Sequence, residues 1–535
     1  MRIAIQLIGG LFLLGLSQAS TTIEQTVPGT RPAPVMVESF DGLGVGFTGP
    51  QGTATLRNPS DNSLAVGPDH IVQTVNSRMA VVTKRGKRFD TSGRVLYGPV
   101  NTNNVFRGFG GACEQRNNGD AVVRFDQLAN RWLIVMPTFS RAEARPDQPP
   151  VWTASDKPYA SPPGRRGQPG AAVPLFIPSA PVAPLASPPA LPAPTGPYSM
   201  CYAVSTTDNP LGSYYRYEFL RPLFPDYPRP AVWPDGYYVP TSTGDEVIEK
   251  HACVVEREAM LKGQPAREQC FVINDVNFLN NADLDGTRLP PGGAPNVILA
   301  AGGTQLKKDF DDDAILAWQF FTNWQDLSKT RLEGPARIAV APYHYLCDGQ
   351  LTNCVPQPGT DRRLDAQGDK LMARVVYRRI GNQESIVAVH SVNTVAGGGG
   401  VRWYEFRLDR AGSPTVYQQG TYAPDSLYRW MGSPAIDKFG NLGMGYSFGG
   451  TPHFAGQRFA GRLPGDPPGV LGLREAVLVE GEAAQTTTLR WQDYTQTAVD
   501  PSDDCTIWYV GDYLKKDATA YSSRIGAFRF PGCSP

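Results

Sequence analysis

Short apolar segments recur along most of the chain, each followed by a turn rich in Asp, Pro or Gly and then by a second apolar segment. The copies lie at 63–69, 121–126, 230–236, 295–299, 371–377, 433–440 and 496–502. The apolar runs are short, and amphipathic helical patterns are almost absent. Runs of this length bounded by turn residues are typical of β-strands. The pattern therefore predicts an all-β protein built from repeats.

One Val or Ile anchors each copy of the repeat. The anchors are Val66, Val123, Val232, Val297, Val375, Ile436 and Val499. Neighbouring anchors are roughly 60 residues apart once a proline-rich stretch is set aside, which is enough for a four-stranded meander. We predict a single β-propeller over 36–533, with seven blades of four-stranded antiparallel meanders. Two stacked β-sandwiches are the alternative, because strand counts alone do not show that a ring closes.

The proline-rich stretch at 144–197 contains 16 prolines, with Ala, Ser and Gly filling most of the rest. Proline donates no backbone hydrogen bond, so such a stretch cannot sustain the ladder of a central strand. We predict an extended surface loop inserted into the propeller.

The first 19 residues have the pattern of an export signal. Arg2 precedes an apolar run at 3–16, and Ser-Gln-Ala at 17–19 matches a small-x-small cleavage site. We expect a mobile leader at 20–35 and a secreted or periplasmic protein. The apolar run is too short to span a bilayer, and no later stretch approaches that length, so we expect no membrane insertion.

The cysteine content agrees with export. The cysteines are Cys113, Cys201, Cys253, Cys270, Cys347, Cys354, Cys505 and Cys533. An even number without a Cys-x-x-Cys pair favours structural disulfides over zinc. Proximity along the chain suggests 347 with 354, 253 with 270, and 505 with 533, which leaves 113 with 201. The sequence does not determine this pairing, since eight cysteines allow many.

The charge balance narrows the range of partners. The chain has 50 basic and 50 acidic side chains and no net charge, with 41% hydrophobic and 19% charged residues. This composition supports a sizeable core and is not that of a disordered protein. Phosphate contacts supply most of the affinity for nucleic acids, so a neutral chain without a basic stripe is a poor nucleic-acid binder. We expect no nucleic-acid partner and a monomer.

Several segments within the repeats carry a resemblance to known proteins. They lie at 108–114, 203–214, 422–425, 429–432, 490–494 and 499–501. With them the sequence resembles a largely uncharacterised family of exported bacterial β-propeller-like proteins, over most of the chain outside 144–197. The resemblance implies export and a repeated β architecture, and it carries no catalytic residues to this chain.

An aspartate precedes most of the anchors by three to six residues. These residues are Asp61, Asp120, Asp226, Asp369 and Asp493. In a propeller they would enter the innermost strands at one rim of the central channel. Trp430, with Arg429 beside it, takes this place before Ile436, and Arg490 and Tyr494 flank the last aspartate.

Such a ring suits a sugar or a cation. Carboxylates serve as acid and base, aromatic rings stack on sugars or cations, and arginines pair with acidic groups. We predict Asp120, Asp226, Asp369 and Asp493 as candidate catalytic residues. We predict Asp61, Arg429, Trp430, Arg490 and Tyr494 as ligand-binding residues, the ligand being an extracellular glycan or other surface polymer. In the alternative, each Asp satisfies its own turn and the protein is a non-catalytic scaffold or adhesion module.

A second acidic pattern resembles half of a calcium loop. Asn281, Asp283 and Asp285 place oxygen ligands at alternate positions before Gly286. The twelfth position is Gly292, which excludes an EF-hand. The pattern is compatible with either a structural Ca²⁺ site or a plain Asx/Gly turn, and we keep these residues as candidate calcium ligands. The Asp-rich run at 309–313 has no following glycine and is predicted to be a solvated loop.

Gly-x-Ser-x-Gly occurs once, at 445–449. A nucleophile elbow needs a helix directly after this motif, and the following Gly-Thr-Pro-His-Phe does not begin one. We therefore predict a glycine-rich strand end here and no serine hydrolase.

Overall fold

The computed structural model describes residues 24–55, 58–140, 159–160, 173–174, 197–221, 224–242, 249–274, 276, 278–302, 313–349 and 353–533. The predicted signal peptide, nearly all of the proline-rich stretch and the run 309–312 lie outside the described residues. The two described α-helices, α1 (Gly111–Gln115) and α2 (Arg257–Leu261), have five residues each. Among the described residues, no helix has the length and apolar character needed to cross a membrane.

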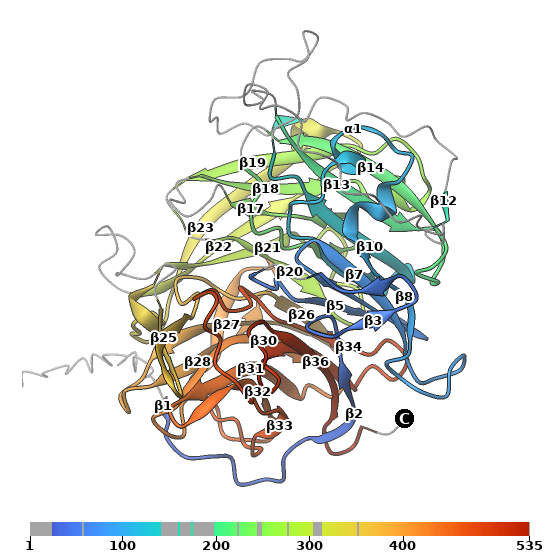
Figure 1. Ribbon diagram of the computed structural model, residues 1–535. Helices are drawn as coiled ribbons and strands as arrows, with labels where there is room; N and C mark the ends of the chain where they lie inside the picture. The colour runs from blue at the N-terminus through green and yellow to red at the C-terminus, as the bar shows by residue number, and fades with distance from the viewer. Residues whose placement is uncertain are drawn as a thin grey trace, which may run out of the picture.

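Four separate sheets each form one blade (Figure 1). The first holds β5 (Ser63–Val66), β6 (His70–Val75), β7 (Arg78–Thr83) and β8 (Val95–Asn101). The second holds β9 (Val122–Asp126), β10 (Arg131–Pro137), β13 (Tyr198–Ser205), β14 (Ser213–Arg221) and β12 (Val173–Pro174). The third holds β15 (Ala231–Trp233), β16 (Gly236–Tyr238), β18 (Glu249–Val255), β19 (Glu268–Asn274), β11 (Tyr159–Ala160) and β17 (Thr241–Ser242). The fourth holds β34 (Gln496–Val499), β35 (Ile507–Tyr513), β36 (Ser522–Arg529) and β2 (Val35–Asp41).

A thirteen-stranded sheet contains the remaining large strands. Its first antiparallel run is β20 (Asn280–Leu284), β21 (Asn296–Gly302), β22 (Ala314–Phe321) and β23 (Arg331–Ala339). Its second is β26 (Val375–Ile380), β27 (Gln383–Asn393), β28 (Gly399–Leu408) and β29 (Pro414–Tyr422). Its third is β30 (Tyr428–Ile436), β31 (Leu442–Gly450), β32 (His453–Arg462) and β33 (Ala476–Val479). The runs are linked by parallel pairs, β20 with β26 and β28 with β30.

Two small hairpins complete the described strands. They are β3 (Thr48–Gly49) with β4 (Gly52–Thr53), and β24 (Asn353–Gln357) with β25 (Thr360–Asp365). The second hairpin lies in the long connection from β23 to β26, which also contributes residues to the candidate site described below.

A strand from the N-terminal part of the chain joins the C-terminal sheet. The strand β2 pairs antiparallel with β36, with Ser39 opposite Gly526. Figure 1 shows β2, in blue, beside the red C-terminal strands. Leu64 and Val66 of the first sheet pack with Trp508 and Ile525 of this last one in a single apolar cluster. Packing of the first sheet against the last is what a closed ring requires, so the prediction of an all-β, propeller-like fold is confirmed.

The inner strands are buried because each sheet is covered by its neighbours. All four residues of β5 and all six of β6 are buried. Leu133 and Tyr202 of the second sheet pack with Val232 and Tyr237 of the third. Strands covered on both faces lose the alternation of apolar and polar residues, and this explains the short continuous apolar runs in the sequence.

Residues 24–34 correct the prediction of a mobile leader. β1 (Glu24–Gln25) pairs with β29, and the buried side chain of Gln25 hydrogen-bonds both the N–H and the C=O of Leu471. Arg31 donates to Asp466 at 2.6 Å. These contacts attach the segment to the propeller, and the polar composition of the segment gave no sign of them.

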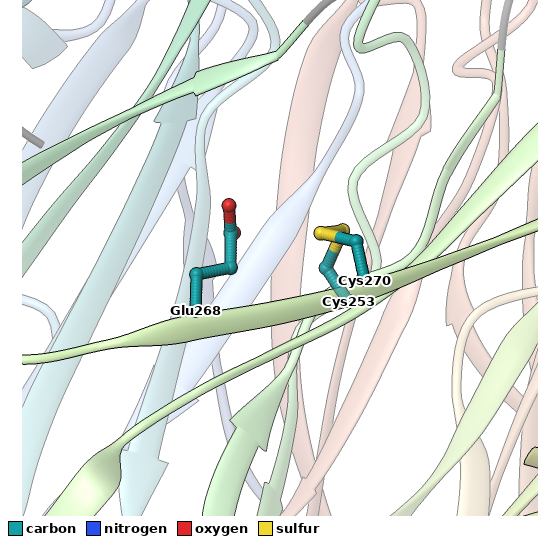
Figure 2. Close-up of side chains that lie close together, drawn as sticks. All are labelled: Cys253, Glu268 and Cys270. Atoms are coloured by element: carbon teal, nitrogen blue, oxygen red, sulfur yellow. A yellow bond between two sulfur atoms is a disulfide. The ribbon is translucent and has the colours of Figure 1, made fainter. Parts of the chain in front are cut away.

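The four disulfides join the pairs that proximity suggested. They are Cys113–Cys201, Cys253–Cys270, Cys347–Cys354 and Cys505–Cys533, and this prediction is confirmed. The bridge between 253 and 270 crosses two adjacent strands at directly opposed positions. Figure 2 shows its sulfur–sulfur bond near the side chain of Glu268.

Candidate functional site

The loops that lead into the innermost strands bring polar side chains together on one side of the ring. We call this group the channel-mouth cluster. It comprises Asp61, Asn76, Asp120, Asp226, Tyr227, Arg229, Asp365, Gln367, Asp369, Lys370, Arg490, Asp493 and Tyr494. All five aspartates predicted from the repeat belong to it. They come from different blades, so the predicted convergence is present, whereas their roles stay a prediction.

Asp61 and Asp120 form a pair at one side of the cluster. The Asn76 amide donates to Asp61 Oδ2 at 2.6 Å and to Asp120 Oδ1 at 3.0 Å. Burial and the negative charges of Asp120 and Asp493 raise the pKa of Asp61 well above its usual value. Burial, Asp226 and Asp493 do the same to the pKa of Asp120, against a lowering hydrogen bond with Asp61. Two carboxyl groups so close favour the form in which one of them is protonated.

Asp493 is held in the opposite way, by a cation. Arg490 donates to Asp493 Oδ1 at 3.2 Å and makes a shorter contact with Oδ2. Gln367 also donates to Asp493 Oδ1, at 3.2 Å. Burial lowers the pKa of Arg490, but Asp493 and Asp365 more than offset this and raise it. A paired guanidinium favours the ionised form of Asp493.

Asp365 competes with Asp493 for the same arginine. Its Oδ2 lies 3.2 Å from Arg490 Nε, and its Oδ1 accepts the backbone N–H of Trp491 at 2.9 Å. Burial and the charge of Asp493 raise the pKa of Asp365 to about 7. The cluster therefore combines carboxyl groups whose pKa is raised with one that is ion-paired.

Aromatic rings and cations form the base of the cluster. The Tyr227 hydroxyl donates to the backbone oxygen of Asp493 at 3.0 Å, and its ring packs against Tyr494 and Phe278. Lys370 Nζ lies 4.1 Å from the centre of the Phe278 ring, and Arg229 lies 4.7 Å from that of Tyr227. Such contacts stabilise cations away from water.

Asp226 and Asp369 complete the group of carboxylates. Asp226 is half-buried and accepts the backbone N–H of Tyr227 at 2.8 Å. Asp369 lies 3.1 Å from Lys370 Nζ. The first of these contacts is the local turn expected if the aspartates are structural, and the negative charge of Asp226 also acts on Asp120 across the cluster.

The backbone is strained at the entry to several innermost strands. The non-glycine residues with positive φ include Asp61 (49°), Tyr227 (55°), Gln367 (47°), Gln492 (35°) and Asp493 (60°). This conformation is costly for residues with a Cβ and persists only where the surroundings impose it. Its recurrence at the cluster is an observation that points toward function.

Arg429 and Trp430 do not line the cluster, which corrects their predicted role. Both lie within β30 rather than before it. Trp430 is fully buried beside Trp491. Arg429 is also buried and forms ion pairs with Asp425 and Glu475. In this blade the strand begins earlier relative to its anchor, so positions that are loops elsewhere are strand positions here.

The predicted calcium ligands are engaged by arginines instead. Arg374 contacts Asp283 at 2.8 Å and also pairs with Asp285, and Arg124 lies 3.2 Å from Asp283. The Asn281 amide donates to Asn296. The carboxylate oxygens that a calcium ion would need are thus held by guanidinium groups, and the arrangement favours an ion-pair network.

Two groups of His, Cys, Asp or Glu side chains in the described residues lie close enough to share a metal ion. They are Cys253, Glu268 and Cys270, and Asp503, Cys505 and Cys533. In both groups the sulfurs are bonded to each other, as Figure 2 shows for the first. A disulfide has no thiolate to offer a metal, so neither group is a candidate metal centre in this state.

Ser447 of the Gly-x-Ser-x-Gly segment lies within β31, in agreement with the predicted glycine-rich strand. Its hydroxyl oxygen accepts from Trp491 Nε1 at 3.0 Å, from Gln492 at 2.5 Å and from Gln457 at 3.2 Å. A Cβ on Gly445 would lie 2.3 Å from the Tyr509 ring. The motif therefore serves close packing and satisfies buried amides.

Sequence reasoning missed several members of the cluster. They are Asn76, Tyr227, Arg229, Asp365, Gln367 and Lys370. Most of them adjoin a predicted aspartate: two follow Asp226, and the last three lie within four residues of Asp369. The neighbours of each predicted aspartate were the available signal. Asn76 lies in the turn between β6 and β7 and had no such signal.

No protein-family model and no curated protein matches this chain. Among solved structures, a Dyadobacter fermentans protein of unknown function is similar at 9% identity and a TM-score of 0.34, covering 93% of this chain and 100% of that one. The NanB sialidase of Streptococcus pneumoniae has 9% identity and a TM-score of 0.36, covering 79% and 68%. The intramolecular trans-sialidase of Ruminococcus gnavus has 8% identity and a TM-score of 0.35, covering 72% and 89%. Similarity of this degree carries no information on the activity of this chain.

Proposed function

We propose that this protein is a secreted, seven-bladed β-propeller that binds and cleaves an extracellular glycan at the channel-mouth cluster. The observation that carries the proposal is the pairing of proton-holding carboxyl groups, Asp61 and Asp120, with an ion-paired carboxylate, Asp493. Most enzymes that cleave glycosidic bonds use one carboxyl group of each kind.

The blade count is supported by the strand pairing. The thirteen-stranded sheet consists of three four-stranded antiparallel runs, and only short parallel pairs link each run to the next. Counted as three blades beside the four separate sheets, they give seven. The last blade takes its outermost strand from the N-terminal part of the chain, which is a common way to close a propeller ring.

Export is supported by the disulfides. All eight cysteines are paired, and disulfides persist in oxidising compartments outside the cytosol. The signal-like sequence at 1–19 is independent support from the sequence. We take the protein to act as a monomer in the periplasm or outside the cell.

The proposed role of each carboxyl group follows from its environment. Asp61 and Asp120 lie in a dry, negatively charged setting that keeps a proton available for a leaving-group oxygen. Asp493, beside Arg490, carries the negative charge that activates water or stabilises a cationic transition state. Asp226 and Asp369 extend the polar surface on which a sugar would hydrogen-bond.

A scaffold function is the second candidate, and one observation favours it. Asp365 and Asp493 hold two long loops together, because both share Arg490 and Asp365 also accepts the N–H of Trp491. Carboxylates used in this way stabilise the loops around the cluster without taking part in a reaction. The experiment below separates the two functions.

The test is a product-release screen. Mature protein is incubated with neutral, basic and acidic polysaccharides, and new reducing ends and unsaturated products are measured. Asp120→Asn and Asp493→Asn are compared with Asp90→Asn, a control at an exposed turn between β7 and β8. We expect release by the wild type and the control, and a loss of roughly a hundredfold or more in both cluster variants.

The stability of each variant is measured by thermal melting alongside the screen. Loss of release in a variant that melts like the wild type supports the proposal. Two results would refute cleavage at this site and favour the scaffold. Either both cluster variants still release products, or the wild type releases none from any polymer.

A further inference from the structure

We infer that the acidic side of the channel-mouth cluster, formed by Asp61, Asp120 and Asp226 around the Tyr494 hydroxyl, binds a protonated amine of the ligand. The glycan bound here would then contain amino sugars with free amines. This inference rests on the proposed function and specifies its substrate class.

The charge balance of the cluster is the first argument. It holds six carboxyl groups, from Asp61, Asp120, Asp226, Asp365, Asp369 and Asp493, against three cations. Each cation already has a partner: Arg490 pairs with Asp493 and Asp365, Lys370 with Asp369, and Arg229 donates to the backbone oxygen of Leu371. A ligand carboxylate entering beside Asp61 would meet an excess of carboxyl groups, whereas a cation would be attracted by them.

Tyr494 supplies the second, independent observation. Its side chain is 3% exposed, and among the described residues its hydroxyl has no hydrogen-bond partner. The negative charges of Asp61, Asp120, Asp493 and Asp226 all act on this hydroxyl. Buried hydroxyl groups are almost always hydrogen-bonded, so one that is unpaired among carboxylates indicates a place for a donor from outside the chain.

The acceptors around Tyr494 suit an ammonium. None of the close groups of metal-ligating atoms in the described residues includes Asp61, Asp120 or Asp226, so these carboxyl groups do not present a compact set of three ligands. An ammonium carries three N–H donors that point in different directions, and this suits separated acceptors such as two carboxylates and a phenol oxygen.

The test uses two matched ligands and isothermal titration calorimetry. A β-1,4-linked glucosamine hexamer and its N-acetylated counterpart share ring, linkage and length, and only the first carries ammonium groups at pH 6. We expect the glucosamine hexamer to bind about tenfold or more tightly than the N-acetylated one.

Three variants test the amine inference further. Asp120→Asn and Tyr494→Phe should each weaken binding of the glucosamine hexamer by about tenfold and reduce the difference between the hexamers. Tyr494→Phe keeps the buried ring, so its fold is preserved while the hydroxyl is lost. Asp90→Asn should bind both hexamers like the wild type.

The outcomes separate this inference from the proposed function. Equal binding of the two hexamers, or tighter binding of the N-acetylated one, overturns the amine inference and leaves glycan binding in place. Cleavage of neutral or acidic polymers without binding of the glucosamine hexamer overturns it as well. Absence of binding and of cleavage across the whole panel refutes the proposed function itself.

Discussion

Replacing Asp365 by Asn should flatten the pH dependence of stability. Burial and Asp493 raise the pKa of Asp365 to about 7, whereas an unfolded aspartate has a value of 3.8. Between those values the folded state holds a proton that the unfolded state has released. Because the group's pKa is raised on folding, its contribution makes the wild type less stable as pH rises from about 4 to about 7.

The magnitude follows from the size of the shift. A difference of roughly three pKa units at about 1.4 kcal/mol each gives about 4 kcal/mol lost across that range. The Asp365→Asn variant cannot ionise, so it avoids this loss and keeps an oxygen that can accept the Trp491 N–H. Its free energy of unfolding relative to wild type should therefore increase by about 4 kcal/mol between pH 4 and pH 7.5.

Urea unfolding at a series of pH values, followed by tryptophan fluorescence, measures this difference. Asp361→Asn is the matched control, because Asp361 is an exposed residue of the same strand, β25. Its profile should parallel that of the wild type. A constant stability difference between Asp365→Asn and wild type across the range would refute the argument that burial and Asp493 hold the proton on Asp365.

Three further predictions concern other parts of the molecule. Arg374→Ala should lower the free energy of unfolding by about 3–5 kcal/mol, because two buried carboxylates on or beside β20 lose this partner. Chemical unfolding measures the change, and a loss below 1 kcal/mol would contradict the ion-pair network. Ser447→Ala should cost about 1–3 kcal/mol while leaving any glycan cleavage unchanged, and a fluorophosphonate probe should not label the wild type. Replacing Cys347 and Cys354 together by Ser should lower stability by about 2–3 kcal/mol, which thermal melting under oxidising conditions would show.

The fold could be predicted from the sequence because the repeated apolar positions lie in the inner strands. Val66, Val123 and Val499 lie in or at the ends of β5, β9 and β34, the innermost strands of their sheets. Each is buried between neighbouring blades, so the apolar positions recur at the spacing of a blade. The outer strands face solvent in part and are less regular, and the pairing of β2 with β36 has no local signal at all.

The aspartates of the site were accessible for the same reason. The loops that enter β5, β9, β15, β26 and β34 reach the same rim, so residues just before these strands converge whatever their distance in sequence. Arg429 and Trp430 failed this rule because β30 begins at Tyr428 and contains an irregular register after Trp430. Spacing to an anchor does not reveal where a strand begins.

The ion pairs across the ring were not accessible from sequence. The segment with Asp283 and Asp285 resembles a calcium loop because oxygen ligands alternate before a glycine. That pattern is local in the sequence. Their partners are distant in sequence: Arg124 lies in β9 of another sheet, and Arg374 directly precedes β26, the strand that pairs with β20. Contacts between distant segments of this kind decide between a metal site and an ion pair.

A crystal structure of the protein with the tightest-binding oligosaccharide from the panel tests the central claim most directly. The account predicts a sugar over the channel-mouth cluster, within hydrogen-bond distance of Asp120 and Asp493. At saturating ligand, a sugar bound elsewhere on the propeller, with the cluster unchanged, would contradict it.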